Sequence, residues 1–239
     1  NADYRDPVAL WASAVAVLPD NLRARAQLGD ALADVARYDE AIAHYDSVLQ
    51  VAPNHGLVRI NRARALEAQG RYTAAVVDYR WFLDQNPSLP DLRNSLGIAL
   101  ERQGDLSGAI AEYRHALDLR PSFRDARFNL AAALEAAGEP GAALEQYWAL
   151  IAAAPGFVPG QRRAAQLLQQ LGDLTTALKH YRQALALAPD DAALHNNAGT
   201  ALAGLGRYFE AAAAFRRALD IDPNYAVARD NLAAALARR

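Results

Sequence analysis

The residues best suited to acid–base or metal chemistry are five histidines, and their spacing does not form a metal site. They are His44, His55, His115, His180 and His195. No two of them stand four residues apart around a glutamate, so the helical zinc motif His-Glu-x-x-His is absent. The chain also has no cysteine, and therefore has neither a thiolate metal site nor a disulfide framework. We predict no cofactor and no metal.

Nucleophilic and phosphate chemistry is not indicated either. The sequence contains no Gly-x-Ser-x-Gly turn and no phosphate-binding loop. Gly104 and Gly108 lie close together, but they fall between two expected helices without a preceding strand. We therefore predict that the chain is not an enzyme.

Hydrogen bonding to another polypeptide is the chemistry that the spacing favours. Asn61, Asn129, Asn197 and Asn231 are separated by multiples of 34 residues. An asparagine amide both donates and accepts, so it can bind the N–H and the C=O of an extended peptide whatever the peptide's sequence. Three glutamates keep the same 34-residue step and predict an acidic stripe: Glu67, Glu101 and Glu135.

The elements that carry these side chains follow from a period in the prolines and glycines. Prolines recur every 34 residues, at Pro19, Pro53, Pro87, Pro121, Pro155, Pro189 and Pro223. Glycines keep the same step at Gly70, Gly104, Gly138, Gly172 and Gly206, and Ala36 stands where the first of that series would be. Strict self-similarity at this period indicates an array of structural repeats.

Each repeat reads as two helices. Around Leu96, Leu100, Ala109 and Tyr113 the apolar residues recur at intervals of three and four, as on one face of a helix. The glycine ends the first helix (helix A) in a left-handed conformation, and the proline ends the second (helix B). Short polar residues follow the prolines and predict N-caps at Asn21, Asn54, Ser88, Ser122 and Asp191.

The repeated pattern resembles the tetratricopeptide-repeat (TPR) family. It has a small residue in helix A, then alanine, an aromatic residue and proline through helix B. The second and third copies read Ala63, Ala75, Tyr79, Pro87 and Gly97, Ala109, Tyr113, Pro121. The resemblance implies an all-α fold, a right-handed superhelical TPR solenoid of antiparallel helix pairs. Six repeats are expected at 22–55, 56–89, 90–123, 124–157, 158–191 and 192–225. Residues 1–21 are expected to supply a lone helix in the helix-B position, and 226–239 a capping helix.

The same resemblance implies where a ligand binds. In TPR arrays helix A lines the concave groove, with positions 5, 6, 9 and 12 among those that face inward. The sixth-position asparagines resemble the ladder that holds protein substrates in the TPR region of O-linked N-acetylglucosamine transferases. Ser95 and Arg163 interrupt the ladder, and an equally simple interpretation is that asparagine is common at this position. The predicted groove residues are Asn61, Asn94, Phe128, Asn129, Arg162, Arg163, Asn196, Asn197 and Asn231.

Charge and hydropathy limit the classes of partner. The formal net charge is −2, with 25 basic and 27 acidic residues interspersed. A nucleic-acid-binding protein normally shows a basic face, so we expect a protein or peptide partner and no nucleic acid. No run of about 18 apolar residues occurs, so no membrane insertion by this segment is expected. The dense breaker cluster at residues 155–160 is interpreted as a kinked helix entry, or alternatively as a hinge.

The first residues suggest a wider context. Tyr4-Arg5-Asp6-Pro7, with Leu10 and Trp11, resembles the junction before the TPR array in transmembrane-and-TPR membrane proteins related to O-mannosyltransferases. That resemblance implies an extracytoplasmic TPR domain, periplasmic in bacteria, attached to an upstream membrane domain and presenting acceptor proteins to it. The alternatives are a free-standing scaffold that binds a peptide, and a self-association module that uses the solenoid ends.

Overall fold

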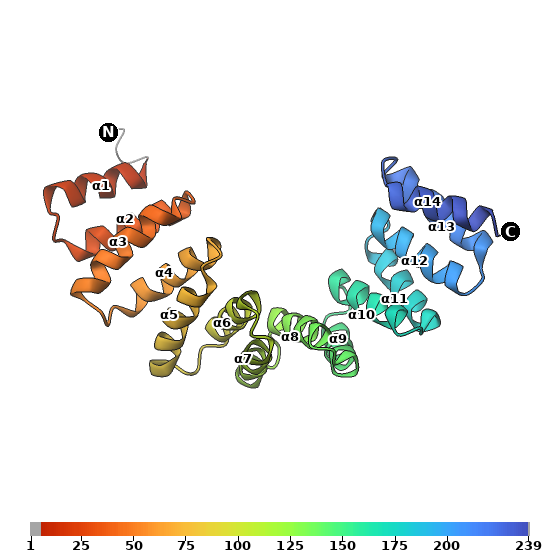
Figure 1. Cartoon of the computed structure of the whole chain (residues 1–239), viewed down its shortest axis with the longest axis horizontal. Coiled ribbons are helices and arrows are strands. Elements are labelled where there is room, and N and C mark those ends of the chain that lie inside the picture. Colours follow the sequence, from red (N-terminus) through yellow and green to blue (C-terminus); the bar gives the residue numbers. More distant parts are fainter. Residues whose placement is uncertain (1–5, 239) are drawn as a thin grey trace. The chain divides into compact units, whose positions relative to one another are not determined.

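The computed structural model describes residues 6–238, and every regular element in that range is an α-helix (Figure 1). The helices are α1 (Pro7–Val17), α2 (Leu22–Asp34), α3 (Tyr38–Val51), α4 (Gly56–Ala68), α5 (Tyr72–Gln85), α6 (Pro90–Gln103), α7 (Leu106–Leu119), α8 (Arg124–Ala136), α9 (Pro140–Ala153), α10 (Val158–Gln170), α11 (Leu174–Leu187), α12 (Ala192–Gly204), α13 (Tyr208–Ile221) and α14 (Ala226–Leu236). Residues up to Ala126 form one compact unit and residues from Arg127 a second, so the division falls within α8.

The helices repeat with the period of the sequence. Helices α2, α4, α6, α8, α10, α12 and α14 begin at residues 22, 56, 90, 124, 158, 192 and 226, each 34 after the last. Within each unit a helix A packs on the helix B that follows it, and that helix B packs on the next helix A. The all-α class and the antiparallel pairs expected from the sequence are confirmed.

A left-handed residue follows each helix A from α2 to α12, whereas α14 ends in a right-handed conformation. Gly70, Gly104, Gly138, Gly172 and Gly206 have φ between 74° and 96°, and Ala36 has φ 59° in the equivalent place. The next amide then bonds back to a carbonyl five residues earlier, as in Asp105 N to Leu100 O at 2.9 Å and Arg37 N to Leu32 O at 2.9 Å. Alanine tolerates this conformation less well than glycine because of its Cβ atom.

The predicted N-caps are correct at two positions and wrong at three others, including Ser122, because α8 begins only at Arg124. Asn21 accepts a hydrogen bond from Ala24 N, and Asp191 accepts one from Leu194 N. Helices α4 and α6 begin one residue later than Asn54 and Ser88 require, so their N-cap residues are His55 and Leu89. Each helix A begins three residues after its proline, so the residue two positions after the proline stands at the N-cap, and the residue directly after the proline does not.

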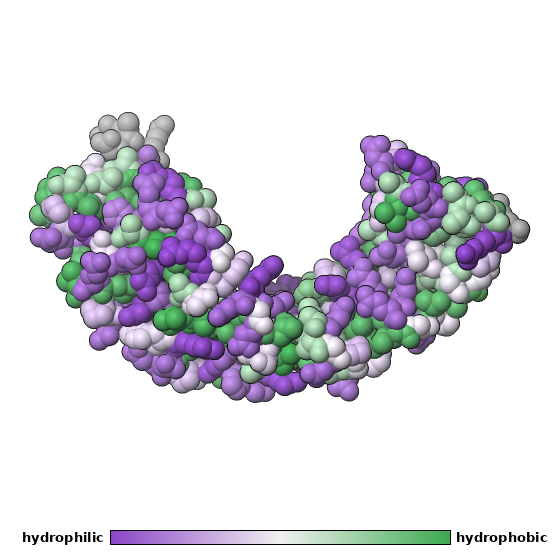
Figure 2. Space-filling view, viewed as in Figure 1, coloured by the Kyte–Doolittle hydropathy of each residue, from purple (hydrophilic) through white to green (hydrophobic). Residues whose placement is uncertain are grey.

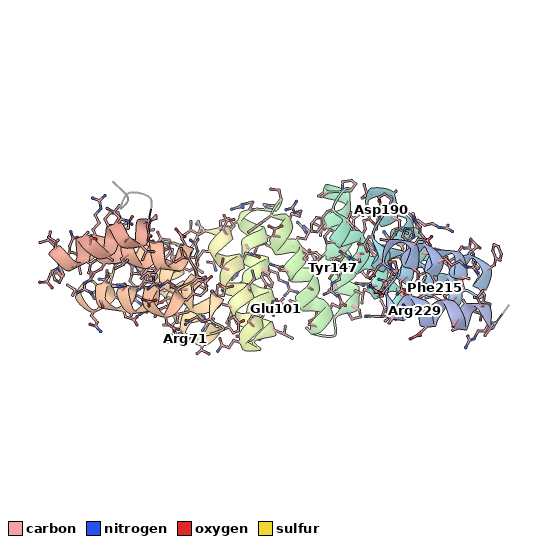
Figure 3. The ribbon with its side chains drawn as sticks, turned by 90° about the horizontal axis from the view of Figure 1, so that it is seen from above. Arg71, Glu101, Tyr147, Asp190, Phe215 and Arg229 are labelled. Carbon is pink, nitrogen blue, oxygen red and sulfur yellow. The ribbon has the colours of Figure 1, made fainter. Side chains whose placement is uncertain are left out.

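Small residues in helix A lie directly against the aromatic residue of helix B. A Cβ atom added to Gly97 would lie 2.5 Å from the Tyr113 ring, and one added to Gly199 would lie 2.6 Å from the Phe215 ring. Tyr113 is fully buried, and Phe215 lies among the helices of the second unit (Figure 3). The predicted burial of Leu96, Ala109 and Tyr113 is confirmed.

A cation in the fourth position of helix A ties the helix to the preceding loop. This position takes the place of the tryptophan that TPR sequences usually carry. Arg59 Nε donates to Pro53 O at 2.9 Å, and Arg93 Nε donates to Pro87 O at 3.0 Å. Arg229 repeats the contact on Pro223 at 3.0 Å (Figure 3). The proline carbonyl, left without a helical partner, therefore receives a charged donor six residues later.

The same fourth position also pairs with helix B, nineteen residues further on. Arg59 meets the fully buried Asp78 at 3.0 Å, and Asp78 receives Arg62 as well, at 2.8 Å. Arg93 meets Glu112 at 2.8 Å. The later pairs are Arg127 with Gln146 at 3.0 Å and Gln161 with His180 at 2.8 Å. Each of these repeats thus joins its two helices with a polar pair of different chemistry.

The breaker cluster at residues 155–160 leads into a regular helix. Pro159 stands in the first turn of α10, as the kinked-entry interpretation of the breaker cluster expects. The boundary between the compact units lies instead in α8.

Across residues 6–238, no helix combines the length and the apolar character that crossing a membrane needs. Figure 2 shows hydrophilic and hydrophobic residues interspersed on the visible face.

We predict that Gly97→Val lowers the free energy of unfolding by about 1–3 kcal/mol, because the new side chain overlaps the buried Tyr113 ring. Denaturant unfolding followed by circular dichroism measures the change. Gly141→Val is the control, since a Cβ atom at Gly141 meets nothing within 4 Å. Equal midpoints for both variants would contradict the close contact.

We predict that Ala36→Gly stabilises the protein by about 1 kcal/mol, because it removes the left-handed strain of alanine. The reverse change, Gly104→Ala, should destabilise by a similar amount through the backbone alone, since an added Cβ atom there has no neighbour within 4 Å. Shifts of the same sign in the two midpoints would overturn this explanation.

Candidate functional site

Successive A helices leave a row of open notches between them. In the first unit one notch lies between α2 and α4 and another between α4 and α6, with volumes of about 390 and 530 Å³. In the second unit notches of about 290 and 170 Å³ lie between α10 and α12 and between α12 and α14. Most of their lining comes from equivalent places in the repeat: positions 9, 12 and 13 of one helix A, an aromatic residue of helix B, and positions 6, 9 and 13 of the next helix A.

The notches share a shape but differ in chemistry. The α2/α4 notch carries Asp30 and Asp34 opposite Arg64. The α4/α6 notch is lined by Arg64, Arg102 and Glu67, together with Ile98 and Tyr72. A row of different notches can accept a row of different side chains.

The two notches of the second unit are less charged. The α10/α12 notch is lined by amides, namely Gln166, Gln169, Gln170 and Asn197, with Arg163 and Tyr181. The α12/α14 notch is mainly apolar, with Phe215, Tyr208 and three alanines beside Asn231 and Arg238. This last notch suits a small apolar side chain, whereas the amide-lined notch suits a polar one.

Three of the sixth-position asparagines, Asn61, Asn197 and Asn231, line these notches, and part of each amide is already bonded. Asn61 Nδ2 donates to Asp30 Oδ1 at 2.8 Å. Asn231 Nδ2 donates to Asn196 Oδ1 at 3.0 Å, and Asn197 Oδ1 accepts a long bond of 3.5 Å from Asn196 Nδ2. Ser95 donates to the carbonyl of Asp91 in its own helix. Asn61 and Asn231 therefore also bind the neighbouring helix A, whereas Asn197 is bonded within its own helix.

The other predicted groove residues are distributed over different environments. Asn94 and Asn196 are buried, at 9% and 5% exposure. Phe128 is half-buried and packs edge-on against Phe157 and Tyr147. Arg162 pairs with Asp191 at 3.3 Å, and Asn129 is half-buried. That these residues contact a ligand stays a prediction, and only Asn61, Arg163, Asn197 and Asn231 line a notch.

The predicted acidic stripe is anchored by buried tyrosines. The Tyr79 hydroxyl donates to Glu67 at 2.8 Å, Tyr113 to Glu101 at 2.9 Å and Tyr147 to Glu135 at 3.3 Å. In each case the tyrosine follows the glutamate by twelve residues, a spacing that would have revealed the pair in the sequence. Figure 3 shows Glu101 in the first unit and Tyr147 in the second. The glutamates are half-buried acceptors with fixed orientation, and so are not simply a solvated charge stripe.

The same arrangement continues at both ends of the stripe with other acceptors. Tyr45 donates to Asp30 at 2.8 Å, and Tyr181 donates to Gln169 at 3.0 Å. Burial, followed by the nearby carboxylate charge, raises the pKa of Tyr79, Tyr113 and Tyr147. Burial alone raises the pKa of Tyr181 to about 12.

Clusters of side chains that could bind a metal ion are not found in the part of the chain that the structure describes. No three histidine, aspartate or glutamate side chains in residues 6–238 are placed to hold a metal ion. The notches offer amides, arginines and carboxylates that already accept tyrosine hydroxyls. Such groups bind and orient a ligand but supply no activated nucleophile.

Comparison with known proteins decides the family. The Tetratricopeptide repeat family model matches residues 26–90, 60–122, 96–156 and 162–226. The chain belongs to the tetratricopeptide-repeat family. The TPR solenoid fold predicted from the sequence is thereby confirmed. Among curated proteins none matches the chain.

Solved structures share the TPR fold at low sequence identity. The C-terminal part of a TPR repeat-containing protein from Cytophaga hutchinsonii is 17% identical with a TM-score of 0.77, covering 94% of this chain and 93% of that one. YrrB, described as a TPR protein with an unusual peptide-binding site, is 19% identical with a TM-score of 0.64, covering 78% and 96%. MamA is 19% identical with a TM-score of 0.66, covering 72% and 93%.

We predict that five tyrosines of the native TPR domain resist ionisation: Tyr45, Tyr79, Tyr113, Tyr147 and Tyr181. Because their folded-state pKa is raised, their contribution to stability is complete below about pH 10 and is lost as the pH rises further. Tyrosinate absorbance at 295 nm in the native protein should lag behind that of the denatured chain until helicity is lost. Tyr113→Phe should reduce the lagging amplitude, and coincident titrations would contradict the prediction.

Proposed function

We propose that this TPR domain is a non-catalytic scaffold that binds an extended segment of another protein along its A helices. The observation that carries the proposal is the row of notches, which recurs with the repeat and changes chemistry from one notch to the next. An extended peptide presents side chains at regular intervals, so it can place successive side chains in successive notches. The peptide-binding site named for YrrB supports the same class of ligand for this fold.

The notches supply binding free energy in addition to that of hydrogen bonds to the peptide backbone. A hydrogen bond contributes a net of about 0.5–1.5 kcal/mol, whereas association costs roughly 4–15 kcal/mol. Side chains buried in the notches add apolar contact and charge pairing to the backbone bonds. The first unit favours a segment that carries both charges, because Asp34 and Arg64 face one notch while Arg64 and Arg102 face the next.

The asparagine ladder has a narrower role in this proposal. Asn61 and Asn231 use Nδ2 within the protein, and Oδ1 of each receives no hydrogen bond from the described residues around it. Each can therefore accept one N–H from a bound peptide backbone. We thus propose that these asparagines resemble the ladder of O-linked N-acetylglucosamine transferases only in their amide oxygen, which accepts a hydrogen bond from the peptide.

We predict that filling three of the four notches weakens peptide binding without unfolding the protein. Ala68 is exposed and lines both notches of the first unit, and Ala234 is exposed and lines the α12/α14 notch. Peptides selected from a random display library on the wild type should bind Ala68→Phe/Ala234→Phe at least about tenfold more weakly, a loss of about 1.4 kcal/mol. Fluorescence anisotropy measures the Kd.

The matched control places the same side chains away from the notches. Ala111 on α7 and Ala213 on α13 are exposed alanines in B helices that line none of the four notches. Ala111→Phe/Ala213→Phe should leave the Kd within about twofold, since a lone exposed apolar residue is ordinary. Equal weakening by both double variants, or no selected peptide, would reject the proposed surface.

The extracytoplasmic alternative rests on the first residues alone. Tyr4 and Arg5 lie outside the described residues, and Asp6 serves as the N-cap of α1. Attachment to a membrane glycosyltransferase-like domain therefore stays a prediction from the sequence. A search for a membrane-spanning domain in the same polypeptide tests it directly.

Self-association is the other alternative, and the terminal helices favour it. No residue of α1 is buried, and Val17 and Val227 are 77% and 54% exposed. Contact between copies through these helices would make the mass rise with concentration in sedimentation experiments. A constant monomer mass over a hundredfold range, about 1–100 μM, would exclude this alternative.

A further inference from the structure

A second concave surface in the second unit is separate from the notches of the A helices. A groove of about 670 Å³ runs along α11 and ends at the turn between α12 and α13. It is lined by Thr175, Leu178, Lys179, Arg182, Gln183, Ala186, Leu205 and Arg207, which we call the α11 groove. The turn lies beside the start of α11, because a Cβ atom at Gly204 would be 2.6 Å from Leu174.

The α11 groove combines carbon surface with positive charge. Leu178 is buried beneath it, while Ala186 and Leu205 are exposed at its surface. Lys179 and Arg182 are exposed, and their aliphatic stems extend the apolar lining. Neither of these two cations has a carboxylate within 4.0 Å among the described residues.

The carboxylate of Glu210, beside the end of the groove, is already paired with an arginine. Glu210 forms two bonds to Arg207, at 2.7 and 2.6 Å, so Arg207 is neutralised at the end of the groove. Lys179 and Arg182 remain as two positive charges beside an apolar lining. An anionic partner gains from both charges without first breaking an internal ion pair.

The shape of the groove selects a polypeptide over a small molecule. All of the lining residues except Leu178 are exposed, so a small ligand would stay largely in water, unlike ligands of enclosed pockets. The lining on α11 extends from Thr175 to Ala186, a distance of roughly 16 Å at the rise of an α-helix. About three turns of a partner helix match that length, which is the usual form of helix-in-groove recognition.

We infer that the α11 groove binds an acidic amphipathic helix of a second protein. Its leucine-type side chains would pack on Leu178, Ala186 and Leu205, and its glutamates or aspartates would face Lys179 and Arg182. This site goes beyond the peptide-binding surface proposed for the A helices, and a ligand on one site leaves the other accessible.

The test uses a display library of fourteen-residue helical peptides. Leucine is held at every third or fourth position, and Glu, Gln, Lys and Arg vary elsewhere. Selection uses the chain carrying Ala68→Phe/Ala234→Phe, in which three of the four A-helix notches are filled, so failure of the proposal for the A helices does not affect the result. We expect the selected pool to be enriched in glutamate.

The affinity of the selected peptides is then measured in two charge variants. Lys179→Gln/Arg182→Gln should weaken binding about tenfold, with a smaller salt dependence than the wild type. Arg80→Gln/Arg114→Gln removes two exposed arginines from B helices of the first unit and should leave the Kd within about twofold. Both pairs are exposed, so circular dichroism should show unchanged helicity.

The single lysine gives an independent readout. Lys179 is the only lysine in the chain, so acetic anhydride modifies one side-chain amine, which mass spectrometry resolves from the N-terminal amine. A saturating selected peptide should slow acetylation of Lys179 about fivefold or more, since a charge-paired amine is less accessible to the reagent. A pool without glutamate enrichment, equal weakening by the two charge variants, or unchanged acetylation would each overturn the inference.

Discussion

The architecture depends on how closely helix A approaches the aromatic residue of helix B. At Gly97 and Gly199 the space that a Cβ atom would occupy is already filled by the rings of Tyr113 and Phe215. In the intervening repeats the position is held by the fully buried Ala131 and Ala165. This contact sets the separation of the two helices, and it also places each tyrosine hydroxyl beside the acceptor on helix A. The walls of the notches are therefore consequences of core packing.

Within each repeat, the core positions and the notch-lining positions differ in how much their residue types vary. Core positions such as Tyr113 and Ala109 hardly vary in type, because interior packing penalises changes of volume. The positions that line the notches carry aspartate, arginine, glutamine, threonine or isoleucine, because they contact solvent and tolerate substitution. One scaffold can thus present a different set of side chains in every repeat without changing its fold. In the proposed function, binding specificity therefore comes from the positions whose residue types vary between repeats.

Much of the fold could be predicted from the sequence, since Pro53, Pro87 and Gly104 mark helix ends through local backbone chemistry. The site was harder to predict because it depends on contacts between repeats. The bond from Asn61 to Asp30 spans 31 residues, and nothing in either local sequence indicates it. Phe128 was predicted as a groove residue by its position, yet the rings of Tyr147 and Phe157 pack against it. The α11 groove could not be predicted from the repeat pattern, because that pattern identifies the core positions of helix B and does not describe its outer face.

The nineteen-residue polar pairs bear on how a repetitive chain finds the correct partner for each helix. Hairpins of similar shape present similar apolar faces, so shape alone would let a newly made helix B settle on the wrong helix A. The pairs differ in chemistry: Arg59 with Asp78, Arg93 with Glu112, and Gln161 with His180. An exchanged pairing that set Asp78 against a glutamine would leave a buried carboxylate without its cation, which is strongly unfavourable. The pairs therefore distinguish one hairpin from another. They favour packing of the hairpins in the same order as they occur along the chain.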